Sequence, residues 1–311
     1  MKKRWWILVA GGLLGVTFLS ACTNRANPAA VGKPIVVATT TMIGDVVSEI
    51  GKDNILLKVM LPVEADPHAF EPTPKDIASA SDADIIFANG AGLEGFLETI
   101  LKNAGGAEKV ILLSDGIQLL EGAPEDPNSQ TPGSGNITDP HVWFDPTNVM
   151  IWSQHIADAL VNQDPDHADA YHTNADAYLS QLSQLDAWIV QQVDQVPPNR
   201  RKLVTDHESF AYFAARYGFE QVGAVLPSYS SLSSSSAQEL ATLEDKIRTL
   251  GTTAIFVGKT VNPTLAEQVA ADTGSQIVYL YTGSLSTSNG PAATYIEMMH
   301  YDVTAIVSAL K

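Results

Sequence analysis

Short apolar runs alternate with segments of helical periodicity from residue 34 to residue 311. Residues 34–39 (PIVVAT) form a β-branched run typical of a buried parallel strand, and 40–50 repeats apolar side chains at the spacing of a helix. The same alternation predicts strands at 55–61, 84–88, 109–113, 202–205, 223–226, 254–257 and 276–281, and helices that begin at Thr73 or span 210–217, 237–250, 262–273 and 295–310. This order predicts parallel sheets with helices on both faces.

One helical segment is longer than the others. No helix-breaking residue interrupts the chain from Pro165 to about Val193, and apolar side chains recur there at threes and fours. At 1.5 Å per residue this helix would span roughly 45 Å, about the length of two domains. We therefore predict an α/β protein of two lobes, 34–163 and 197–311, each a parallel-sheet sandwich, joined by a rigid helix within 164–196. The turn-rich segments 121–139 and 228–236 are expected to be loops.

Charge and cysteine content narrow the functional classes. The chain carries 18 basic and 35 acidic residues in 311, a formal net charge of −17. Such an acidic balance argues against nucleic acid as a partner and suits a cationic ligand. A single cysteine excludes a disulfide within the chain.

The N-terminal residues are typical of an export signal. Three basic residues precede the apolar run 5–19, which is too short to cross the roughly 30 Å hydrocarbon core comfortably. The run ends in Leu19-Ser20-Ala21-Cys22, which resembles a bacterial lipobox. We predict that 1–21 is a lipoprotein signal peptide, that Cys22 is lipid-modified, and that 22–33 is a tether to the membrane at the cell surface or in the periplasm. The alternative is an ordinary signal peptide followed by an incidental cysteine.

Three of the seven histidines stand out because each follows a strand-like segment and precedes a helix, where ligands collect in open α/β sheets. His68 and His141 share the sequence Asp-Pro-His, and His207 comes directly after the strand 202–205. Neutral imidazoles suit zinc and other first-row divalent ions, and neighbouring carboxylates can fix their tautomers. We expect these three histidines to bind a metal; the alternative is that each is a surface or capping residue of a turn.

The other histidines carry no such pattern. His155, His167 and His172 are expected on solvated helix faces, and His300 is expected to be structural. The sequence contains no GxGxxG, Walker, GxSxG or HExxH motif. With Cys22 assigned to the lipid anchor, cysteine–histidine nucleophilic chemistry is also excluded.

Several motifs together resemble one transport family. They are Pro67-His68-Ala69-Phe70-Glu71-Pro72-Thr73-Pro74 with Asp76, Asp139-Pro140-His141-Val142-Trp143, Asp206-His207-Glu208-Ser209-Phe210, Thr260-Val261-Asn262-Pro263, and the terminal Gly290-Pro291 with Met298-Met299. With the lipobox, they make the chain similar over 34–311 to the cluster A-1 solute-binding lipoproteins of zinc and manganese ABC transporters.

This resemblance implies a fold and a ligand set. Such proteins hold an ion in the cleft between two α/β lobes joined by one rigid helix, and they deliver it to an ABC permease. The resemblance implies His68 and His141 as ligands from the first lobe and His207 from the second. Histidine at this third position is commoner among zinc-type members, so Zn²⁺ is favoured and Mn²⁺ is the alternative. We expect a monomer that is not an enzyme.

The departures from the family pattern concern acidic residues of the second lobe. Gly283, in Thr-Gly-Ser-Leu, stands where the family carries an aspartate ligand. Gly258 and Lys259 replace a common Glu and Asn, and the run 231–236 replaces an acidic segment. Glu208 could supply the missing carboxylate only if its loop turned inward, and we expect it to point away.

Three functions are therefore weighed. The leading interpretation is metal capture and delivery to a permease. A second is a degenerate family member that acts as a surface adhesin or regulator, which the substitutions near the cleft would explain. The least favoured is a three-histidine zinc hydrolase, because no general base other than Glu208 is positioned by the sequence.

Overall fold

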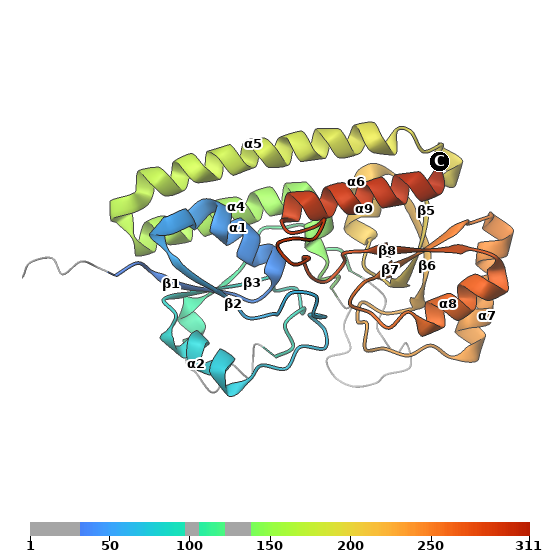
Figure 1. Cartoon of the computed structure of the whole chain (residues 1–311), viewed down its shortest axis with the longest axis horizontal. Helices are drawn as coiled ribbons and strands as arrows, with labels where there is room; N and C mark the ends of the chain where they lie inside the picture. The colour runs from blue at the N-terminus through green and yellow to red at the C-terminus, as the bar shows by residue number, and fades with distance from the viewer. Residues whose placement is uncertain (1–31, 97–105, 122–137) are drawn as a thin grey trace, which may run out of the picture. The chain divides into compact units, whose positions relative to one another are not determined.

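Each half of the chain builds a four-stranded parallel sheet (Figure 1). The computed structural model describes residues 32–96, 106–121 and 138–311, so the predicted lipidation site Cys22 and most of the predicted loop 121–139 lie outside the described residues. The first sheet has the order β2-β1-β3-β4, with β1 (Ile35–Ala38), β2 (Leu56–Val59), β3 (Ile85–Ala88) and β4 (Val110–Leu112). The second has the order β6-β5-β7-β8, with β5 (Lys202–His207), β6 (Glu220–Leu226), β7 (Ala254–Gly258) and β8 (Gln276–Leu280). Both lobes thus follow one topological plan, and the predicted two-lobed α/β fold is confirmed.

Several of the helices begin where the sequence supplies a capping side chain. Their bounds are α1 (Thr41–Gly51), α2 (Pro74–Asp82), α4 (Pro146–Gln163), α5 (Ala168–Val193), α6 (Ala211–Tyr217), α7 (Ala237–Leu250), α8 (Thr264–Thr273) and α9 (Tyr295–Leu310). Helix α2 opens with a capping box between Thr73 and Asp76, and α7 with one between Ser236 and Glu239. Gly251 ends α7 in the left-handed conformation that glycine adopts most easily.

Helices cover both faces of both sheets. In β1, Val37 packs toward α2, whereas Val36 and Ala38 face the side of α1 and α4. In the second lobe, Val204, Ile255 and Val257 pack against α7 and α8, and the opposite face of the sheet meets α6 and α9. Strands β1, β3 and β7 are continuous runs of apolar residues and glycine, as expected for parallel strands covered on both sides.

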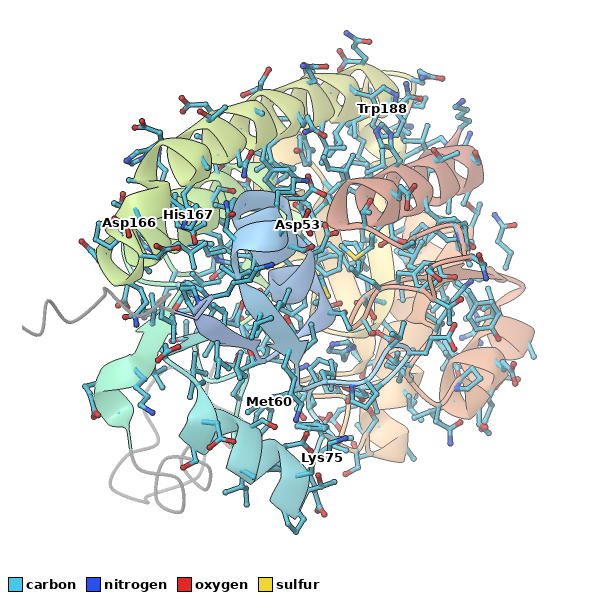
Figure 2. The ribbon with its side chains drawn as sticks, turned by 60° about the vertical axis from the view of Figure 1, so that its left-hand side comes forward. Asp53, Met60, Lys75, Asp166, His167 and Trp188 are labelled. Atoms are coloured by element: carbon cyan, nitrogen blue, oxygen red, sulfur yellow. The ribbon has the colours of Figure 1, made fainter. Side chains whose placement is uncertain are left out.

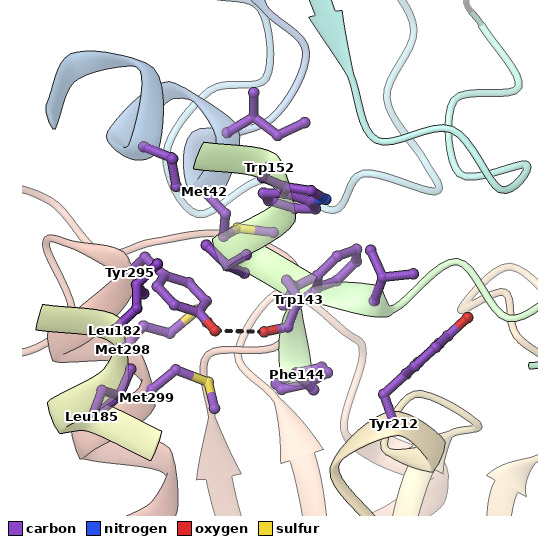
Figure 3. Packing of buried hydrophobic residues seen from close by; sticks show 14 of the residues in the cluster. Met42, Trp143, Phe144, Trp152, Leu182, Leu185, Tyr212, Tyr295, Met298 and Met299 are labelled. Carbon is purple, nitrogen blue, oxygen red and sulfur yellow. Dashed lines mark hydrogen bonds between the residues drawn. The ribbon is translucent and has the colours of Figure 1, made fainter. Parts of the chain in front are cut away.

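A single hydrophobic core connects the two lobes. Helix α5 runs along both of them and packs against α1, α4 and α9 (Figure 1). Residues of α4, α5 and α9 interdigitate with Met42 and Trp143, and the hydroxyl of Tyr295 donates a hydrogen bond of 2.7 Å to the carbonyl of Trp143 (Figure 3). Because this core is continuous, α5 and α9 both hold the lobes together by packing, and α5 also links them in sequence.

Several element ends differ from prediction, and three of them have a clear structural reason. Strand β5 continues to His207 instead of ending at Thr205, because His207 still pairs with Leu226 of β6. Strand β6 begins at Glu220 rather than Gly223, since Glu220 pairs with Lys202 at the start of β5. Helix α8 begins at Thr264, two residues late, because the side chain of Asn262 accepts the amide hydrogen of Thr264.

The buried side chains of α5 lie at its predicted apolar positions, from Tyr171 to Val193. Asp166 and His167 lie just before the first residue of α5, and Trp188 lies toward its other end (Figure 2). Trp188 packs against His300 of α9 with ring centroids 4.1 Å apart, which supports the predicted structural role of His300. Among the residues that the structure describes, no helix is long and apolar enough to cross a membrane.

Candidate metal centre

The three predicted histidines come together although they lie far apart in the sequence. His68 lies in the irregular segment between β2 and α2, His141 directly precedes a short 3₁₀ turn (Val142–Phe144), and His207 is the last residue of β5. All three side chains thus lie near the carboxyl ends of strands, where open parallel sheets place their ligand sites.

The spacing of the imidazole nitrogens suits one metal ion. Nε2 of His141 lies 3.2 Å from Nε2 of His68 and 3.2 Å from Nε2 of His207. A potential ligand atom from each of the three rings lies within 4.8 Å of the others. A tetrahedral ion with metal–nitrogen bonds of about 2.0–2.1 Å would place its ligand nitrogens about 3.3–3.4 Å apart. The rings therefore need only small shifts to surround an ion.

The space at these nitrogens is small and enclosed. It measures about 10 Å³, and Pro67, Trp143, Thr282 and Gly283 line it together with the histidines. Such a volume holds one water-sized guest. His141 and His207 are only 1% and 3% exposed, so a bound ion would be taken almost completely out of water.

Buried carboxylates orient two of the three rings. Nδ1 of His141 lies 2.8 Å from Oδ1 of Asp139, and Nδ1 of His207 lies 2.7 Å from Oδ1 of Asp206. Each of these carboxylates therefore accepts the Nδ1 hydrogen of its histidine, which directs the lone pair of Nε2 toward the ion space. The other oxygen of Asp206 accepts the amide hydrogen of Gly258 at 2.7 Å.

The protonation states differ among the three rings. Burial, together with the neighbouring imidazoles, lowers the pKa of His68 to about 3 and holds the pKa of His141 well below its usual value. Burial would also lower the pKa of His207, but Asp206 outweighs it and raises that pKa above its usual value. Without a metal, His207 is thus the ring that binds a proton most readily, and protons compete there with an incoming cation.

The position of the missing fourth ligand is filled by the first lobe. A Cβ atom at Gly283 would lie 2.7 Å from Cδ of Pro67, so a larger side chain there requires Pro67 to move. Glu208 does not replace the carboxylate, because it lines a different cavity of about 300 Å³ beside α7. The expectation that Glu208 points away therefore agrees with its position.

Two departures from the family pattern have structural explanations. At Gly258 a Cβ would lie 2.1 Å from Oγ1 of Thr282 and 3.2 Å from Oδ2 of Asp206, so this packing leaves no room for a glutamate. Ser231, in the serine-rich segment, donates a hydrogen bond of 2.5 Å to Oδ2 of Asp66 in the other lobe. Sequence reasoning missed this contact, and no local signal reveals a pair separated by 165 positions.

The histidines that were predicted to lie on solvated helix faces are not part of this centre. His167 and His172 are exposed, and His155 is half-buried on α4. Nδ1 of His167 lies 2.7 Å from Oδ2 of Asp164 at the start of α5, which is a local helix-end contact. Within the described ranges, the three-histidine cluster is the one group with metal-binding spacing.

Known proteins share this architecture. The model for the family of zinc-uptake complex component A, periplasmic, matches residues 36–309. The manganese-binding lipoprotein MntA of Halalkalibacterium halodurans is 33% identical over 276 residues, which cover 88% of each chain. The iron ABC transporter substrate-binding lipoprotein MtsA of Streptococcus pyogenes is 31% identical over 320 residues, which cover 100% of this chain and 99% of MtsA.

A solved structure also shares this architecture. The periplasmic zinc binding protein TroA from Treponema pallidum superposes with a TM-score of 0.79 at 28% identity, covering 90% of this chain and 99% of TroA. The similar proteins are metal-binding transport components and not enzymes. Since the family match and the relatives above 30% identity both extend over nearly the whole chain, the protein belongs to the zinc-uptake complex component A family of metal-binding substrate-binding proteins of ABC transporters.

Proposed function

We propose that the protein captures Zn²⁺ outside the cytoplasmic membrane and delivers it to an ABC permease. The observation that carries this proposal is the convergence of His68, His141 and His207, from both lobes, on a space that holds one ion. Relatives named for manganese, iron and zinc support transport of a divalent transition metal without selecting the ion.

The donor atoms favour zinc. Three imidazole nitrogens meet at the site, and the cluster of potential ligands includes no carboxylate among the described residues. Mn²⁺ is a harder ion that prefers carboxylate and water oxygens, whereas Zn²⁺ accepts imidazole readily. The fourth ligand would then be a neutral oxygen, either of water or of Thr282, whose Oγ1 is buried in the same wall without a hydrogen-bond partner in the described part of the chain.

Protons compete with the ion at this centre. The raised pKa of His207 means that its ring binds a proton more readily than an ordinary histidine. Zinc affinity should therefore fall as the pH falls, because the imidazolium cannot coordinate a metal.

We also propose that the chain reaches its site of action as a lipoprotein. Residues 1–21 would be removed, Cys22 would carry the lipid, and 22–33 would tether a monomer to the outer face of the membrane. Incorporation of labelled fatty acid into the wild-type protein, lost in Cys22→Ser, tests the anchor. Equal labelling of both proteins would contradict it.

Metal content and titration test the proposed cargo. We expect mass spectrometry of the purified protein to find one zinc per chain, and competitive titration to favour Zn²⁺ over Mn²⁺. The variants His68→Ala and His207→Ala should lose the metal, while His172→Ala, an exposed histidine on α5, should retain it. A preference for Mn²⁺ would overturn the choice of ion. Failure to bind any metal would favour the alternative of a degenerate adhesin or regulator.

A further inference from the structure

An ion bound at the three histidines needs a route to solvent. Its space is enclosed, and two of the ligands are almost completely buried. His68 is the exception because it is half-buried and lies in the irregular segment between β2 and α2.

The ring of His68 is also held differently from the other two. Asp139 and Asp206 each accept a hydrogen bond from Nδ1 of their histidine. Asp66 accepts instead from the backbone amide of His68 at 2.9 Å, and among the described residues no hydrogen bond holds Nδ1 of the His68 ring. Of the three rings, this one can therefore rotate at the smallest cost.

The side of the ion space formed by the loop after β8 is closed by contacts between the lobes. Gly283 packs directly on Pro67, and the indole nitrogen of Trp143 donates to the carbonyl of Thr282 at 3.2 Å. Beyond them, the amide of Leu285 donates to Oγ1 of Thr41 at 2.9 Å. An ion that left in this direction would have to separate these packed and hydrogen-bonded groups.

On the side of His68 the described residues leave a cavity. His68 forms part of the wall of a cavity of about 380 Å³, whose other walls include Ala91 and Thr138 from the first lobe and Tyr229 and Ser230 from the second. This is far larger than the ion space itself and is large enough for a hydrated cation. The cavity therefore extends from the one ligand that can rotate.

The charges around this cavity favour a cation. Burial and the carboxylates of Asp139 and Glu208 raise the pKa of Tyr229, in the cavity wall, to about 12. The net charge of the chain is −17, so the negative field acts over a longer range as well. Such a field raises the local concentration of cations and speeds their association.

We propose that the cation enters and leaves through the cavity between Ala91 and Tyr229, and that the ring of His68 rotates to admit it. This inference rests on the proposed metal-binding function. In this mechanism His141 and His207 receive the ion first, and His68 closes the site as the last ligand. Cavity size then controls the rates of binding and release but not the equilibrium.

Stopped-flow measurements with Zn²⁺ and a competing fluorescent chelator test the route. Ala91→Phe narrows the cavity because it adds a phenyl group to the cavity wall. We expect it to lower the association and dissociation rate constants together, each about tenfold, so that Kd is unchanged. Tyr229→Ala widens the cavity and should raise both rate constants.

Two controls separate this effect from general perturbation. Ala91→Ser alters the residue without adding bulk, and Thr242→Phe adds a phenyl group to the separate cavity beside Glu208. Both should bind and release Zn²⁺ at the wild-type rates. Unchanged rates in Ala91→Phe and Tyr229→Ala, with normal zinc binding, would overturn the route alone. Absence of zinc binding in the wild-type protein would instead overturn the proposed function on which the route rests.

Discussion

The same tripeptide, Asp-Pro-His, occurs twice in this protein and is used in two ways. In 139–141, Oδ1 of Asp139 accepts hydrogen bonds from both the backbone amide and the ring of His141. In 66–68, Asp66 accepts the backbone amide of His68, but its other oxygen binds Ser231 in the opposite lobe. The first copy holds a ligand in place, whereas the second joins the lobes and leaves its ligand ring free. A motif thus specifies a local turn, and its surroundings decide what the carboxylate does.

Removing the histidine of each motif should have the largest effect on zinc binding and should distinguish the two motifs. His141→Ala removes the central ring, to which both other rings point, and should weaken zinc binding by more than about a hundredfold, beyond the usual loss from an outer partner. His68→Ala leaves the oriented pair and should act mainly through faster dissociation. Isothermal titration and stopped-flow release measure the two effects. Equal association and release kinetics in both variants would contradict the distinct role of His68.

The aspartates of the two motifs should also differ in their effect on zinc affinity, with the larger effect in 139–141. Asp139→Asn removes the carboxyl group that orients His141 and should weaken zinc binding about 10- to 100-fold. Asp66→Asn removes no contact to an imidazole ring and should change Kd much less. Parallel competitive titrations of the two variants provide the measurement, with circular dichroism as the control for folding. A larger loss in Asp66→Asn would show that the two motifs have been assigned the wrong roles.

Asp139 should also affect the stability of the metal-free protein. Burial raises the pKa of Asp139 to about 7, so the folded protein retains a proton that the unfolded chain releases near pH 4. This group therefore makes the free energy of unfolding fall as the pH rises from about 4 to 7, by at most about 1.4 kcal/mol per pH unit. Asp139→Asn should reduce that slope in urea unfolding of the metal-free protein. An unaltered slope would mean that Asp139 is ionised throughout this range.

Substitutions of Gly283, which contacts Pro67, should change zinc affinity by a smaller factor. Gly283→Ala adds a Cβ 2.7 Å from Cδ of Pro67, which should displace the His68 segment and weaken zinc binding several-fold. Gly283→Asp carries the same steric change but adds a carboxylate, so it should bind zinc more tightly than Gly283→Ala. If the two variants have equal affinity in competitive titration, the absent fourth ligand does not limit retention of the ion.

The smallest expected effect concerns the contact between the lobes at Asp66. Ser231→Ala removes its hydrogen bond, and one hydrogen bond to a charged group contributes about 1.5–3 kcal/mol at most when fully buried. Because this contact is only partly buried, we expect zinc dissociation to accelerate a few-fold with little change in association. Ser233→Ala in the same segment serves as the matched control.

The order of elements was predicted from local chemistry, and the three histidines that the structure brings together were singled out by their sequence positions and by the resemblance to the family. Apolar runs and capping residues predicted helices α7 and α9 to the residue, because their end signals lie next to them in the sequence. His68, His141 and His207 could be identified because residues after parallel strands meet at one edge of a sheet. The end of β5 was misplaced, since only its pairing with Leu226 extends that strand to His207.

The closure of the site depends on contacts between residues that lie far apart in the sequence. The hydrogen bond of Ser231 to Asp66, the packing of Pro67 on Gly283 and the lack of space at Gly258 each involve residues brought together only by folding. The sequence determined which atoms can bind a metal, because donor chemistry belongs to the side chain. The packing of one lobe on the other determined that Asp66 binds Ser231 and where the cavity beside His68 lies, because these features join residues of different lobes.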